Sequence, residues 1–316
     1  MARQPAPRSL ALTSRSPRLL AFALLTLFGC GPRRWSSEAT DAPVAPPVAA
    51  APTGEPGAGP DATRDPEGAV TLTPAEAPPP LARVPRVAFA APKDGASIAA
   101  DKTDAFEVRV DVRDWFVEPG EHIHLVLDNR PYKALEAGKT AIRLGDIFPN
   151  EPLAEGQHVL VAFAARPDHM AVKPQDPLAA GVAKPKEGGP FAMVGFWVGK
   201  PGKAAFKPGD AALVYSRPKG TYNGGDAERV LLDFWVANAP LGEGRWSVLA
   251  VVTPPRGEAA TARLDSWTPM VIGNLPDGTT KVTLELRDKD DRPVAGPFGR
   301  IEREISVNRA ASGPTL

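Results

Sequence analysis

Short runs in which apolar and polar residues alternate fill the sequence from residue 86 onward. Residues 106–112 place Phe, Val, Val and Val at every second position, with Glu, Arg and Asp between them. Alternation with a period of two is typical of a strand with one buried face. Turn-forming residues at 92–95, 119–120 and 277–278 separate the runs. No stretch shows a sustained helical period, so the pattern predicts an all-β fold.

The two halves of this β region also match each other. Alternating runs lie at 86–90, 106–112, 122–127, 157–165 and 191–198 in the first half, and at 211–215, 229–236, 245–252, 281–287 and 301–307 in the second. Turn and strand-end residues recur in the same order: Pro92-Lys93-Asp94-Gly95 with Pro218-Lys219-Gly220, Arg143-Leu144 and Pro149 with Arg263-Leu264 and Pro269, Leu153 and Gly156 with Leu275 and Gly278, and Gly189-Pro190-Phe191 with Gly296-Pro297-Phe298. This self-similarity predicts a duplicated unit, with about 15 extra residues in the first copy between Ala165 and Gly188.

Each copy has about 100 residues and six or seven short strands, which is the size and rhythm of an immunoglobulin-like (Ig-like) sandwich. The pattern resembles bacterial Ig-like or fibronectin-like modules. The chain has a single cysteine, so the disulfide of antibody domains is absent. We therefore expect two tandem Ig-like β-sandwich domains, at 86–200 and 210–310. A jelly roll and one larger β-sandwich are the alternatives.

The first 29 residues carry the signature of an export signal. Four arginines lie within residues 1–18, and the uncharged run 19–28 follows them. A basic start followed by a short apolar run is typical of a secretory signal, and ten residues are too few to span a bilayer. The sequence Leu27-Phe28-Gly29-Cys30 resembles the lipobox of bacterial lipoproteins, which implies lipidation at Cys30. The residue after it is Gly31 and not aspartate, which by the same resemblance favours the outer membrane. An ordinary signal peptide is the alternative.

Residues 30–85 are predicted to form a disordered tether between the lipid anchor and the first domain. Positions 41–85 contain 12 prolines and 11 alanines and no aromatic residue. Such a segment cannot bury enough apolar surface to offset the entropy lost on ordering. The tether is expected to hold the folded domains away from the membrane.

All four histidines of the chain fall in the first copy. His122 and His124 lie two positions apart, so on a strand both face the same side. If other strands bring His158 and His169 close, the imidazoles form a site suited to zinc or copper. The segments 121–129 and 153–160, with Pro167-Asp168-His169, resemble small His-rich periplasmic domains of unknown function. The alternative is that the histidines lie on a solvated surface and bind no cofactor.

A second candidate site lies in the second copy, in the Pro/Gly-rich segment 213–224. Tyr215, Arg217, Lys219 and Tyr222 combine aromatic and cationic side chains, which suit recognition of a peptide or glycan. The alternative is an edge strand that proline and lysine protect from unwanted pairing.

Other functions find less support in the sequence. The 37 basic and 37 acidic residues balance, which argues against nucleic-acid binding. No nucleophile elbow, phosphate loop or His-Glu-x-x-His motif is present, so an enzyme is not expected. The leading hypothesis is a non-enzymatic, lipid-anchored cell-envelope protein that recognises a protein or glycan partner. The alternative is a periplasmic zinc- or copper-binding protein that uses the histidines of the first domain.

Overall fold

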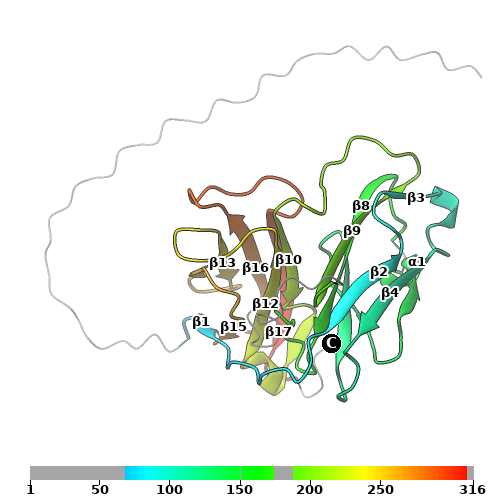
Figure 1. Ribbon diagram of the computed structural model, residues 1–316. Coiled ribbons are helices and arrows are strands. Elements are labelled where there is room, and N and C mark those ends of the chain that lie inside the picture. The colour runs from blue at the N-terminus through cyan, green and yellow to red at the C-terminus, as the bar shows by residue number, and fades with distance from the viewer. Residues whose placement is uncertain (1–67, 150, 174–187, 312–316) are drawn as a thin grey trace, which may run out of the picture. The chain divides into compact units, whose positions relative to one another are not determined.

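The computed structural model describes residues 68–149, 151–173 and 188–311 (Figure 1). The regular secondary structure of this part of the chain is almost entirely strands. Its helical elements are one turn of α-helix, α1 (Leu144–Ile147), and two 3-10 turns, η1 (Ala100–Lys102) and η2 (Gly224–Ala227). The prediction of an all-β fold with two Ig-like sandwiches is confirmed.

The first sandwich has a three-stranded and a five-stranded sheet. The smaller sheet has the order β2-β4-β7, with β2 (Arg86–Ala91), β4 (Glu107–Arg113) and β7 (Ala141–Arg143). The larger sheet has the order β3-β9-β8-β5-β6, with β3 (Ala96–Ile98), β9 (Phe191–Val198), β8 (Gly156–Ala165), β5 (His122–Leu127) and β6 (Lys133–Leu135).

The second sandwich repeats this plan. Its four-stranded sheet has the order β1-β15-β12-β10, with β1 (Thr71–Pro74), β15 (Met270–Gly273), β12 (Val230–Ala237) and β10 (Ala212–Arg217). Its five-stranded sheet has the order β11-β17-β16-β13-β14, with β11 (Thr221–Asn223), β17 (Arg300–Asn308), β16 (Gly278–Arg287), β13 (Ser247–Thr253) and β14 (Ala260–Leu264).

The strand orders match when strands β2 to β9 are paired, in chain order, with strands β10 to β17. Strand β1 is an additional edge strand of the second sandwich. Gly156 and Gly278 open β8 and β16, as the duplication predicts. The predicted match of Arg143-Leu144 with Arg263-Leu264 is wrong. Arg143 ends β7, whereas Arg263 lies in β14, whose counterpart in the first copy is β6. Two-residue similarity does not determine the equivalent strand.

The predicted tether of residues 30–85 is also wrong over its last part. Residues 71–74 form β1, which pairs antiparallel with β15 and places Leu72 opposite Ile272. Leu72 and Val70 pack against the core of the second sandwich. Val70 and Leu72 alternate with threonine, and this short pattern is sufficient for an edge strand. The prediction from proline and alanine content did not take it into account.

Each sandwich has its own apolar core, and a third cluster joins residues of both. Ile123, Leu125 and Leu127 of β5 point into the first core. Val126 belongs to the third cluster, where it joins Trp235 of β12. Both faces of β5 are therefore covered, and all six of its residues are buried. The face of β5 that carries the histidines is a junction between the two sandwiches.

Polar contacts reinforce this junction. The buried Asn129 donates to the carbonyl of Leu213 at 2.8 Å, and its amide oxygen accepts from the backbone N–H of Tyr215 at 2.9 Å. The guanidinium of Arg303 donates to the carbonyls of Asn129 and Ser216. Burial is the main influence on this group and lowers the pKa of Arg303 to about 10. Because these bonds satisfy buried backbone groups of both copies, they fix the elements around β5.

Candidate functional site

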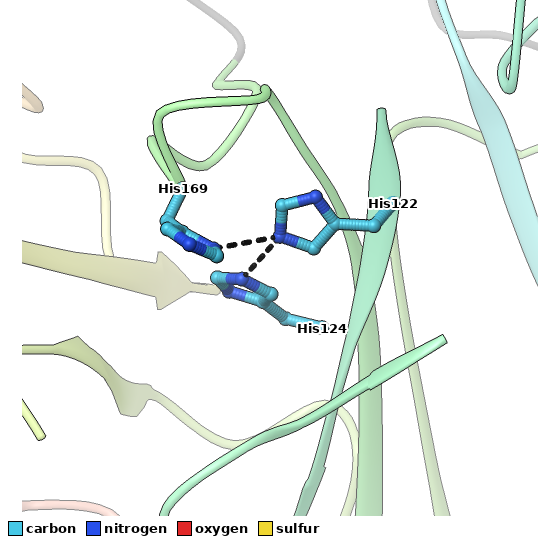
Figure 2. Close-up of side chains that lie close together, drawn as sticks. All are labelled: His122, His124 and His169. Atoms are coloured by element: carbon cyan, nitrogen blue, oxygen red, sulfur yellow. Dashed lines mark hydrogen bonds between the residues drawn. The ribbon is translucent and has the colours of Figure 1, made fainter. Parts of the chain in front are cut away.

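Three of the four histidines converge at this junction (Figure 2). His122 and His124 project from the same face of β5, as the period of two predicts. His169 lies in the tight turn that follows β8, where its φ of 68° is in the left-handed region. The N–H of His169 donates to the carbonyl of Arg166, which closes this turn against the end of β8.

His122, His124 and His169 are called the histidine triad below, and their imidazole nitrogens face a common point. His122 Nε2 lies 2.9 Å from His124 Nε2 and 3.0 Å from His169 Nδ1. One nitrogen from each residue lies within 4.8 Å of the other two. Ligands of a tetrahedral zinc ion are roughly 3.3 Å apart, since each Zn–N bond is about 2.0–2.1 Å. The triad therefore needs only small side-chain adjustments to hold one ion.

The Nδ1 atoms of His122 and His124 each contact a neighbour that orients the ring. His122 Nδ1 lies 2.7 Å from the carbonyl oxygen of Gly120. A carbonyl only accepts, so Nδ1 carries the hydrogen and Nε2 is the acceptor in its contacts with His124 Nε2 and His169 Nδ1. His124 Nδ1 lies 3.2 Å from Ser216 Oγ, a contact in which the imidazole can donate in the same way. Metal-ligating histidines characteristically donate their other N–H to such a neighbour.

The surroundings keep the triad uncharged. Burial is the main cause that lowers the pKa of His124 well below its usual value, and the neighbouring His122 and His169 add to it. Burial, followed by the charge of Arg217, lowers the pKa of His169 to about 3. Burial likewise lowers the pKa of His122. Neutral imidazole is the form that binds a metal, so no proton has to leave the triad at neutral pH.

An aromatic ring and two cations complete the environment. The ring of Tyr132 stacks on His124, with ring centroids 3.5 Å apart. Lys219 Nζ lies 3.8 Å from the centroid of the Tyr132 ring, and the guanidinium carbon of Arg217 lies 5.6 Å from it. Burial is the main cause that raises the pKa of Tyr132 to about 12, and it lowers the pKa of Lys219 to about 8.

The fourth histidine, His158, does not join the triad, so the predicted four-histidine site is wrong in this respect. β5 and β8 run antiparallel, with His122 opposite Ala165, which puts His158 at the far end of β8. There Nδ1 bonds to Asp128 Oδ2 at 2.7 Å and Nε2 to the carbonyl of Ala154 at 2.8 Å. Burial lowers the pKa of His158, but these two bonds outweigh it, and the pKa lies above its usual value.

Of the four residues predicted for recognition in segment 213–224, two are buried and two are partly exposed. Tyr215 and Tyr222 are 0% and 4% exposed, so they are core side chains and their prediction as contact residues is wrong. The cause is that both tyrosines face the core of the second sandwich, Tyr215 from β10 and Tyr222 from β11. Arg217 and Lys219 are partly exposed and lie beside Tyr132. The two predicted sites therefore adjoin each other.

The second copy, called the sister copy below, shows which residues the same scaffold accepts at the positions of His122, His124 and His169. Ala165 and Arg287 end β8 and β16, and they pair with His122 and Ser247 respectively. His122 and His124 therefore correspond to Ser247 and Leu249. The turn after each strand is closed by the same hydrogen bonds, from His169 N to Arg166 O and from Asp291 N to Asp288 O. The fold thus forms with Ser, Leu and Asp at these three positions and does not require imidazoles.

Sequence reasoning missed Tyr132, Ser216 and Gly120 as neighbours of the triad. Tyr132 lies on the same face as His124 because β5 and β6 pair with His124 opposite Ala134, two residues beyond Tyr132. Ser216 comes from the other sandwich, and no pattern within either copy indicates it. Cys30, the predicted lipidation site, lies outside the residues that the structure describes. Within the described ranges, none of the helices has the length and apolar character needed to cross a membrane.

Comparisons with known proteins leave the function open. No protein-family model matches the sequence, and no curated protein matches it. The chain is similar to fibronectin(III)-like modules of CbhA from Clostridium thermocellum, at 13% identity and a TM-score of 0.25, over 73% of this chain and 98% of that one. It is similar to N-cadherin EC1-3 of Drosophila, at 11% identity and a TM-score of 0.22, over 71% and 68% of the chains. A third match is SGBP-B of Bacteroides ovatus, solved with a mixed-linkage heptasaccharide, at 12% identity and a TM-score of 0.18, over 76% and 70%. Similarity at this level carries no functional argument.

Proposed function

We propose that this protein binds a transition-metal ion, zinc or copper, through His122, His124 and His169. The observation that carries the proposal is the convergence of three imidazole nitrogens, one from each residue, within 4.8 Å of one another. Imidazole suits both metals, and three such ligands leave a further coordination position.

Two further features support a ligand role over a packing role. The pKa values of all three imidazoles are lowered, and Gly120 and Ser216 orient the rings of His122 and His124, which is the preparation that metal ligands need. The second sandwich forms the same strand and turn with Ser247, Leu249 and Asp291, so the sandwich itself does not need imidazoles at these positions. Two buried imidazoles in contact with a third, partly buried one carry a polar cost that an apolar junction avoids.

The proposal is tested by titrating zinc and copper into the full chain by calorimetry. The chain carries Cys30→Ala in all samples, so that no acyl group is attached. The test variant replaces the triad with its sister residues, His122→Ser, His124→Leu and His169→Asp. The matched control replaces the remaining histidine with its sister residue, Thr280, as His158→Thr.

We expect one metal ion per chain for the parent protein and for the His158→Thr control, and loss of that binding in the triad variant. Equal affinity in the parent and the triad variant overturns the proposal. Equal circular dichroism spectra and unfolding midpoints ensure that the triad variant is compared in its folded state.

We further propose that the site is carried by an exported lipoprotein anchored through Cys30, most simply in the outer membrane. This rests on the basic start, the apolar run 19–28 and the lipobox-like residues that end at the single cysteine of the chain. Cells fed an alkyne-tagged fatty acid should label the protein, and Cys30→Ala should remove the label and release it from membranes. Labelling that persists in the variant contradicts this assignment.

The competing interpretation is a non-enzymatic module that binds an envelope protein or glycan. It keeps two of its four predicted contact residues, Arg217 and Lys219, because the two tyrosines are buried. We therefore place it below metal binding. Enrichment of a partner over a control lipoprotein in pulldowns from solubilised envelope, lost on Arg217→Ala/Lys219→Ala substitution, would reverse that order.

A further inference from the structure

The phenol of Tyr132 lies beside the three imidazoles. Its oxygen is 3.4 Å from His169 Nδ1, the nitrogen that faces His122. The side chain is buried, at 4% exposed, and its ring lies nearly parallel to that of His124, with 13° between the planes. The packing leaves the hydroxyl close to the point on which the three imidazoles converge.

The charged groups around the three imidazoles favour an anionic fourth ligand. The triad is neutral, and the charged groups that act on both His124 and His169 are the cations Arg217 and Lys219. On His122, the carboxylates of Glu136 and Asp168 oppose the charge of Arg217, and Glu136 acts more strongly than Arg217. A dication held by three neutral ligands beside two cations is electrostatically disfavoured. One negative oxygen in the coordination sphere offsets part of that repulsion.

Lys219 and Arg217 are placed to stabilise such an oxygen. Lys219 Nζ donates to the backbone carbonyl of Tyr132 at 3.2 Å and lies over its ring. The guanidinium carbon of Arg217 lies 5.6 Å from the centroid of the same ring. Both cations come from β10 and the turn after it, in the second sandwich. The second copy thus places positive charge beside the Tyr132 side chain.

We propose that Tyr132 Oη is the fourth ligand, so that the protein binds its metal through three imidazoles and one phenolate. This inference rests on the proposed function. When the oxygen–metal bond forms, the O–H bond of the phenol breaks and its proton passes to solvent. Four protein ligands close the coordination sphere, which favours holding or transferring the ion over activating a bound water.

The test uses copper(II) and the full chain with Cys30→Ala. A phenolate bound to copper(II) gives a charge-transfer absorption in the visible spectrum that imidazole ligands alone do not give. We expect this band at one equivalent of copper, and we expect Tyr132→Phe to abolish it while leaving the ring packed on His124. The affinity for zinc in the same variant should fall at least tenfold, in line with the roughly 10–100-fold loss seen when supporting groups of metal sites are removed.

A neighbouring tyrosine gives a matched control. Tyr222 Oη accepts from Arg217 at 3.4 Å and from the backbone N–H of Lys219 at 3.3 Å, so it shares the cations with Tyr132. Tyr222→Phe should keep the band. Resonance Raman spectra of the parent protein, excited within the band, should show phenolate vibrations whether or not the Tyr132→Phe variant folds.

The outcomes separate the two proposals. Copper and zinc binding without the band, and unchanged in Tyr132→Phe, overturns the phenolate ligand and leaves the three-histidine site standing. Absence of any metal binding by the parent protein overturns the proposed function, and the phenolate ligand with it.

Discussion

Replacing Asp233 with alanine removes the anchor of the segment that carries His169. Asp233 lies in β12 and is 0% exposed. One of its carboxylate oxygens accepts from the backbone N–H of Ala171 at 2.8 Å. The other forms a buried ion pair with Lys173. Both partners follow His169 within four residues, so Asp233 holds the end of this turn in place against the second sandwich.

The expected cost follows from burial. Removal of one partner from a buried ion pair costs about 3–5 kcal/mol, because the remaining charge has lost its counter-ion in a dry environment. The double variant Asp233→Leu/Lys173→Met removes both charges and should recover most of that loss. The exposed pair of Arg130 and Glu151 serves as the control, and Glu151→Ala should cost less than about 1 kcal/mol.

Equilibrium unfolding in urea measures these differences, with the metal left out. In the same Asp233→Ala variant, zinc affinity should fall although no ligand has changed, because His169 is held less firmly. A loss of stability below about 1 kcal/mol would refute the assignment of a buried, coupled pair. Unchanged zinc affinity in a variant that has lost the expected stability would refute the positioning role.

Three further predictions concern protonation and packing. The pKa of His158 is raised in the folded state, so its pairing with Asp128 stabilises the protein below about pH 6.5 and loses that effect as the pH rises through the folded pKa; urea unfolding of His158→Thr at acid and alkaline pH checks this. The pKa of His124 is lowered, so without metal the free energy of unfolding should fall by up to about 1.4 kcal/mol per pH unit below about pH 6.5, and His124→Leu should reduce that slope. Gly120→Ala should destabilise the folded protein, since φ is 86° and the new Cβ would lie 2.9 Å from Pro167 Cβ; a thermal unfolding midpoint equal to that of the parent would contradict this.

The sequence predicted the strands well because each copy buries one face of most strands in its own core. It could not predict which faces the junction between the copies covers. The face of β5 that carries His122 and His124 is covered in this way. Tyr215 and Tyr222 were predicted as contact residues for a different reason, because they lie among cationic, proline and glycine residues, although both belong to the core of the second sandwich. β1 was missed for a related reason, because its pairing partner β15 lies about 200 residues later in the chain.

The candidate site was predicted in part. The spacing of His122 and His124 placed them on one face of a strand, and this requires only the period of a strand. The inclusion of His158 failed because the antiparallel register, which the spacing does not reveal, sends it to the other end of β8. The position of His169 depends on a tight turn and on anchoring by Asp233, both of which are tertiary features.

X-ray absorption at the zinc edge of the metal-loaded full chain tests the central claim most directly. The account predicts one zinc ion bound by three imidazole nitrogens at about 2.0–2.1 Å, with the multiple-scattering pattern of histidine rings. The pattern should be lost when His122, His124 and His169 are replaced by the residues of the sister copy. A shell of oxygens alone, or a spectrum unchanged by those three substitutions, would contradict it.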